Sequence, residues 1–183
     1  MISHGAFMAV LIILSLVFSV LHLPQTAPDL LGYWRPQWIL LALILWVQRI
    51  PEYRGGLFAL LFTKSASDEG TTARRVLVMV WLLGFYLDTL LGDAFGLNGA
   101  IHATIAFYLL RFRERLQMQT LLQQMVMVFM MVFLAELLRA YVRNTVTGQP
   151  WSLQPLALAV SSMVFWPLYV LAAAKMLGGQ RRA

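Results

Sequence analysis

Ionisable side chains interrupt the apolar stretches of this chain at Asp88, His102, Glu136 and Arg139. A charge exposed to lipid is unfavourable by roughly 3 kcal/mol or more, so each of these groups is expected to face protein or a wet cavity. Carboxylate, imidazole and guanidinium groups can bind a polar ligand or a partner, and they can equally hold helices together. The residues around them indicate which role each one has.

Small residues recur every four positions around Asp88, at Gly84, Gly92 and Gly96. On a helix this spacing rotates by only about 40° per step, so these residues are expected to share one face that another backbone can approach closely. Near the outer end of its helix, Asp88 also meets the negative end of the helix dipole, so a compensating group is expected. This face is the leading candidate for a partner interface.

A second polar group is predicted from His102, Glu136 and Arg139, because His102 and Glu136 come to a similar depth if the chain runs back and forth across a membrane. Glu136 and Arg139 can pair at i, i+3 on one helix face. Two interpretations stay open: an internal ion-pair network that holds helices together, and a partner-binding or ligand-binding role. His102 is expected to be a hydrogen-bonded packing residue, since no second His or Cys stands beside it at metal-ligand spacing.

Motifs for enzyme chemistry are absent from the sequence. It contains no G-x-x-x-x-G-K-[ST], H-E-x-x-H or G-x-S-x-G pattern and no cysteine. We therefore expect no catalytic residues, no metal site and no cofactor.

The composition indicates a membrane protein: 60% of the 183 residues are hydrophobic, 12% are charged, and the mean hydropathy is +0.73. The net charge of +6 lies in short clusters without a basic groove, which argues against nucleic acid as a partner. The sequence predicts an all-α integral membrane bundle of about six transmembrane helices, forming a single domain over residues 1–183. The apolar runs are Ala6 to Leu23, Trp34 to Ile50, Val76 to Leu91, Leu97 to Leu110, Leu121 to Val142 and Pro155 to Leu177.

Most of the 14 Lys and Arg residues fall in alternate connections, which predicts that both termini are cytoplasmic. A cytoplasmic loop is expected over residues 52–75, with an interfacial apolar segment at Gly55 to Thr63 and a mobile tip at Ser65 to Thr72. The hairpin Val76 to Leu110, turning at Gly92 to Gly96, either spans the membrane or is partly re-entrant.

The second apolar run opens with Trp34-Arg35-Pro36-Gln37-Trp38. Pro36 fits the first turn of a helix, where its missing N–H costs nothing, and Trp34 and Trp38 are expected to anchor at the membrane interface. Arg35 is one of few cations on the outer side.

Arg35-Pro36 before an apolar span, followed by Gly84-x-x-x-Asp88-x-x-x-Gly92-x-x-x-Gly96 and a short apolar helix, resembles MreD, the bacterial rod-shape-determining membrane protein family. The resemblance covers nearly the whole chain in size and expected topology, and the loop over residues 52–75 is longer than the family pattern suggests. It implies a multi-pass bacterial inner-membrane protein with a helical fold similar to the substrate-binding subunits of energy-coupling-factor transporters.

The resemblance also implies a non-enzymatic scaffold of the machinery that elongates the lateral cell wall. Its expected partners are MreC above all, then RodA, a penicillin-binding transpeptidase and MreB, together with membrane lipid. The alternative that the residues leave open is a small-molecule-binding membrane transporter subunit, because a helical bundle with a buried carboxylate, His102 and Arg139 can surround a polar ligand.

Overall fold

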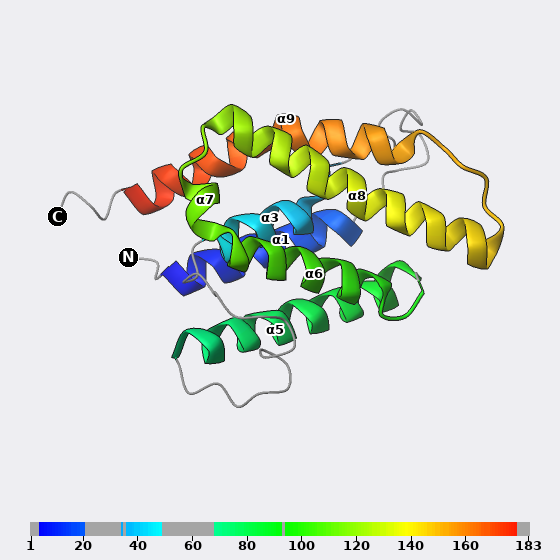
Figure 1. Cartoon of the computed structure of the whole chain (residues 1–183), viewed down its shortest axis with the longest axis horizontal. Helices are drawn as coiled ribbons and strands as arrows, with labels where there is room; N and C mark the ends of the chain where they lie inside the picture. Colours follow the sequence, from blue (N-terminus) through cyan, green and yellow to red (C-terminus); the bar gives the residue numbers. More distant parts are fainter. Residues whose placement is uncertain (1–3, 21–33, 35, 49–67, 93, 179–183) are drawn as a thin grey trace. The chain divides into compact units, whose positions relative to one another are not determined.

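The computed structural model describes residues 4–20, 34, 36–48, 68–92 and 94–178, and nearly all of them are helical (Figure 1). These residues contain no strand, so the all-α prediction is confirmed for them. Each predicted apolar run contains a helix, and the short α7 is additional. The helices are α1 (His4–Val20), α3 (Trp38–Val47), α5 (Asp68–Leu91), α6 (Leu97–Arg111), α7 (Arg113–Gln117), α8 (Leu121–Thr147) and α9 (Gln154–Gly178).

Two stretches are long and apolar enough, by length and composition, to cross a membrane: Leu121–Val146 in α8 and Gln154–Ala172 in α9. Large apolar side chains such as Met130 and Leu134 are exposed on α8. Lipid-facing helices have this pattern, because lipid does not penalise exposed apolar surface as water does. The apolar helices thus indicate association with a membrane.

The chain forms two compact units, residues 43–119 and residues 1–42 with 120–183. We call the first the α5–α6 unit and the second the α8–α9 unit. The division falls within α3, whose side chains are buried almost all round, including Leu40, Leu41 and Ile44. A helix that is apolar on every side is normally a buried one.

In the α8–α9 unit, the two long helices lie side by side (Figure 1). Val128 and Val132 of α8 and Trp166 of α9 are fully buried, and the Trp166 indole donates to Gln124 Oε1 at 3.3 Å. Helix α8 begins with a capping box, in which Thr120 and Gln123 exchange side-chain and backbone hydrogen bonds. It ends at Thr147, and the C-cap residue Gly148 has a left-handed conformation.

In the α5–α6 unit, α5 and α6 form a helical hairpin joined by the turn that the glycines predicted (Figure 1). The prediction of a mobile loop tip is wrong for residues 68–72, because α5 already begins at Asp68. The last residues of the predicted loop over 52–75 are therefore helical as well. The predicted interfacial segment at Gly55 to Thr63 lies outside the described residues.

Candidate functional site

Helices α5 and α6 meet backbone to backbone at Gly84. A Cβ atom added at Gly84 would lie 2.6 Å from both the Cα and the N atom of Gly99, a separation that no real side chain could occupy. On the other side of the contact, a Cβ at Gly99 would lie 3.0 Å from the Trp81 carbonyl oxygen. The close approach expected at Gly84 therefore exists, but the backbone that approaches is this chain's own α6.

Asp88 closes the hairpin one turn further along α5. Its carboxylate accepts a hydrogen bond from Gly96 N–H at 2.7 Å and another from Asn98 N–H at 2.9 Å. The first N–H groups of a helix have no partner within the helix, and the residue at the N-cap of α6 is Gly96, which has no side chain to offer. Asp88, only 1% exposed, supplies the missing acceptor from the neighbouring helix.

This contact also identifies the group that compensates Asp88. The positive end of the α6 dipole and two backbone N–H groups meet the carboxylate, which offsets the unfavourable end of α5. The expected compensating group therefore exists, and it consists of backbone N–H groups rather than a side chain. The available signal was an α6 start, Gly96-Leu97-Asn98, without Ser, Thr or Asp at the cap position.

Gly84, Asp88, Gly92 and Gly96 were expected to share one helix face. This prediction is wrong for Gly92 and Gly96. Helix α5 ends at Leu91, so Gly92 and Gly96 belong to the turn and only Gly84 and Asp88 share a helix face. Gly92 has φ of 68° and Gly96 has φ of 86°, conformations that side-chain-bearing residues rarely adopt. The spacing of four had two causes: helix packing at Gly84 and turn geometry at Gly92 and Gly96.

His102 is buried at 2% exposure on α6, and its Nδ1–H donates to the Asn98 carbonyl at 2.7 Å. It is thus a hydrogen-bonded packing residue, as predicted. Asn98 links it to the cap, because Asn98 N–H is one of the two donors to Asp88. The hairpin end therefore contains one continuous polar chain from Asp88 through Asn98 to His102.

Glu136 and Arg139 pair directly on α8, and each residue is only 5% exposed. The predicted i, i+3 pair is confirmed. This pair belongs to the α8–α9 unit and His102 to the α5–α6 unit, so the predicted cluster of all three residues stays a prediction. Within the described residues, no group of three or more His, Cys, Asp or Glu side chains could bind a metal ion.

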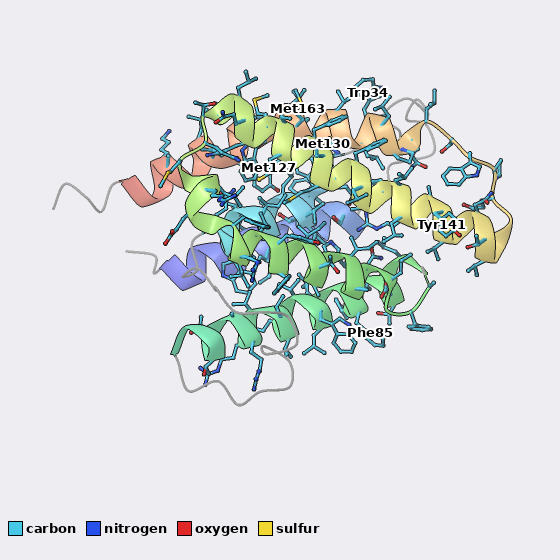
Figure 2. All side chains as sticks on the ribbon, in the orientation of Figure 1. Trp34, Phe85, Met127, Met130, Tyr141 and Met163 are labelled. Carbon is cyan, nitrogen blue, oxygen red and sulfur yellow. The ribbon has the colours of Figure 1, made fainter. Side chains whose placement is uncertain are left out.

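The Trp34-Arg35-Pro36-Gln37-Trp38 motif differs from expectation at Pro36, and Arg35 lies outside the described residues. Pro36 precedes α3, which begins at Trp38, so it is not in the first helical turn. The Trp38 ring contacts Phe165 of α9 at 5.2 Å between centroids. Trp38 thus packs within the α8–α9 unit, and Trp34, labelled in Figure 2, is half exposed. The interfacial position of both rings stays a prediction.

Ser162 of α9 holds the start of α3 in the same unit. Its hydroxyl accepts from Gln37 N–H at 2.9 Å and donates to the Leu158 carbonyl at 2.7 Å. Gln37 directly precedes α3, so this contact supplies an acceptor at a helix start, as Asp88 does in the other unit. Ser162 was not among the residues predicted from the sequence.

An apolar groove of about 570 Å³ runs along the α5–α6 hairpin. Its lining is bulky on α5 and mostly small near the start of α6: Leu77, Val78, Trp81, Ala100, Ala103, Thr104, Phe107 and Tyr108. Phe85, labelled in Figure 2, stacks on Trp81 with ring centroids 5.8 Å apart. The groove was not predicted from the sequence, although Ala100 and Thr104 stand four residues apart on α6 and small residues at that spacing mark helix-packing surfaces.

The polar side chains of the hairpin bind backbone groups of the hairpin itself. The Asp88 carboxylate is engaged with backbone N–H groups, and His102 Nδ1 is engaged with a carbonyl. A groove of apolar and small residues can bind an apolar helix or ligand.

The chain matches no family model, and it matches neither a curated protein nor a solved structure. The resemblance to MreD therefore rests on the sequence motifs.

Proposed function

We propose that this chain is a non-enzymatic membrane scaffold of the MreD type, acting in the bacterial machinery that elongates the lateral cell wall. In this proposal it binds MreC, and through MreC it is linked to RodA, a penicillin-binding transpeptidase and MreB. Catalysis would belong to those partners. The apolar helices and the structural use of Asp88 and His102 support a scaffold rather than an enzyme.

The observation that carries the proposal is the groove on the α5–α6 hairpin. Gly84 and Asp88 already serve the contact between α5 and α6, so we move the partner interface from their face to the groove beside it. Ala100 and Thr104 let a second backbone come close, while the exposed Trp81 and Tyr108 can pack along it. A bitopic partner such as MreC would place its transmembrane helix there.

The membrane arrangement is part of the proposal. We propose six spans in the bacterial inner membrane, with both termini cytoplasmic and a fold similar to the substrate-binding subunits of energy-coupling-factor transporters. The distribution of Lys and Arg supports the orientation. Helix α6 would cover only about 22 Å, so its hairpin with α5 crosses a thinned or locally distorted region, or partly re-enters.

A matched pair of variants tests the interface. Ala100→Phe fills the groove with an apolar ring that lipid tolerates, and Ala172→Phe makes the same change at another exposed position, on α9. Both proteins should accumulate normally in the native membrane. Ala100→Phe should lose co-purified MreC and rod shape, whereas Ala172→Phe should keep both. If Ala100→Phe recovers MreC at the wild-type level, the groove is not the interface.

The groove also favours one rival function, a small-molecule-binding transporter subunit. Its volume of about 570 Å³ falls within the range of ligand sites. In that case an apolar ligand should raise the melting temperature of the purified protein, and Ala100→Phe should abolish the rise. A ligand-dependent shift with unchanged MreC recovery in Ala100→Phe would favour the transporter function over the scaffold.

A further inference from the structure

A column of stacked side chains continues the groove of the α5–α6 unit beyond the end of α6. Tyr108, which lines the groove, stacks on Phe112 with ring centroids 6.4 Å apart. The Arg115 guanidinium lies 5.9 Å from the centroid of the Phe112 ring. All three side chains are exposed. The apolar groove is therefore followed, two stacking distances beyond Tyr108, by a guanidinium group at the protein surface.

The charges at this end of the hairpin favour an anionic partner. Residues 111–115 carry a net charge of +2, from three arginines and one acidic residue: Arg111, Arg113, Arg115 and Glu114. The start of α5 lies at the same end of the hairpin, and its charges sum to zero: Asp68, Glu69, Arg74 and Arg75. A cation over an aromatic ring keeps its charge, and the edges of the guanidinium plane can still donate to a carboxylate. This end of the groove thus complements a negative charge.

The small side chains of α6 determine how a helix can lie in the groove. Four lining residues stand at positions i, i+3, i+4 and i+7: Ala100, Ala103, Thr104 and Phe107. Residues at this spacing form the hole that receives one side chain of a facing helix in knobs-into-holes packing. Such helices cross at roughly 20°, so a helix packed in this way runs nearly along α6. It would continue past Tyr108 toward Arg115.

We propose that the helix bound in the groove carries an acidic residue that pairs with Arg115. This inference rests on the proposed scaffold function and specifies the partner helix of that interface. A large apolar side chain of the partner fills the hole on α6, and Asp or Glu follows roughly 8–12 residues further toward α7, at about 1.5 Å per residue. In the proposed topology this end is cytoplasmic, where the flanks of membrane helices are normally basic. The acidic residue therefore distinguishes this partner from other single-span helices.

Recovery of MreC with the tagged full-length protein tests the pairing. Arg115→Gln should weaken MreC binding roughly two- to fivefold, which corresponds to the loss of one exposed ion pair. Arg115→Glu should weaken it further, because it places like charges together. The matched control is Arg75→Glu, an exposed arginine at the same end of the hairpin that projects about 120° away from Trp81 around α5. It should leave MreC recovery unchanged.

A charge swap identifies the partner residue. Replacing the acidic residue of the MreC helix by Arg should weaken binding to the wild-type protein and restore binding to Arg115→Glu. An MreC helix without Asp or Glu in these turns, or equal losses in Arg75→Glu and Arg115→Glu, overturns the pairing. Binding is also measured in phosphatidylcholine vesicles with and without phosphatidylglycerol. If the loss in Arg115→Glu requires phosphatidylglycerol and the swap restores nothing, the negative charge comes from lipid and the pairing is wrong.

The groove variant Ala100→Phe separates this inference from the scaffold function. Loss of MreC in Ala100→Phe with normal recovery in Arg115→Glu contradicts the pairing alone. Normal recovery in both variants contradicts the interface, and this inference with it. Because Arg115 is exposed, Arg115→Glu should keep the melting temperature of the protein within about 2 °C, which shows that any loss of MreC is not caused by unfolding.

Discussion

Asp88 offers the sharpest test of how the hairpin is held together. Its two carboxylate oxygens each accept one backbone N–H at the start of α6, at 2.7 and 2.9 Å, in an almost fully buried site. A hydrogen bond to a charged group contributes about 1.5–3 kcal/mol, and a buried donor left unsatisfied costs a similar amount. Asp88→Ala removes both acceptors, so it should lower the free energy of unfolding by roughly 3–5 kcal/mol.

Asp88→Asn is the more informative change because it keeps the shape of the side chain. Its amide has one oxygen, which can accept from one N–H, and one NH₂ group, which then faces the other N–H. We expect a loss of about 2–3 kcal/mol, which corresponds to roughly 4–12 °C in melting temperature for a protein of this size. If the hairpin needs only a polar group at position 88, Asp88→Asn should keep the wild-type stability. If it needs two acceptor oxygens there, the variant should show this loss.

Thermal denaturation in detergent, followed by helical circular dichroism, measures the change. Thr89→Ala is the control, since Thr89 is exposed and its hydroxyl donates only to the Tyr86 carbonyl of its own helix. It should move the midpoint by less than about 2 °C. Amide hydrogen exchange at Gly96 and Asn98 should accelerate in Asp88→Asn. A wild-type melting temperature together with unchanged exchange at both amides would refute the capping role.

Further predictions concern packing, pairing and topology. Gly84→Ala places a methyl group against the backbone of α6 and should cost about 1–3 kcal/mol or more, visible as a lower melting temperature; full tolerance would show that the helices can separate there. Glu136→Ala and Arg139→Ala should each reduce the protein level, and exchanging the two charges should restore part of it; no recovery would contradict a direct stabilising pair. Single cysteines at Ser67 and Thr147 report topology in this cysteine-free chain, and an impermeant outer-face reagent should label only Thr147→Cys. Labelling of Ser67→Cys alone would invert the topology.

Hydrophobic patterning predicted the helices well because apolar runs bounded by Gly, Pro and charges contain enough local information. Each of the apolar runs contains a helix, and the hairpin turn falls at Gly92 to Gly96 as predicted. The Glu136–Arg139 pair was equally accessible, since it depends only on positions within one helix. The start of α5 was missed because Asp68 to Thr72 are polar residues, which resemble a loop until the helix they extend is taken into account.

Contacts between helices were harder to predict. Trp38 packs against Phe165, a residue far away in the sequence, and no local pattern indicated that contact. The groove likewise combines Trp81 with Ala100 and Thr104, so neither helix alone reveals it. Side-chain type and spacing indicate that a face can be packed against, whereas the partner is chosen by the folded arrangement of all the helices.

The role of Asp88 follows from a requirement of any tight helical hairpin in an apolar environment. The first N–H groups of the second helix point away from that helix, and burial without water makes each unsatisfied one expensive. Gly96, at the cap position, provides the left-handed turn but no side-chain acceptor. A carboxylate one turn before the end of the first helix reaches these groups across the turn, and its charge is favoured by the dipole of the second helix. A single acidic residue upstream of a glycine-bounded turn can therefore be explained by the hairpin itself. Loss of partner binding in an Asp88 variant would then demonstrate an interface only if α6 remained correctly capped.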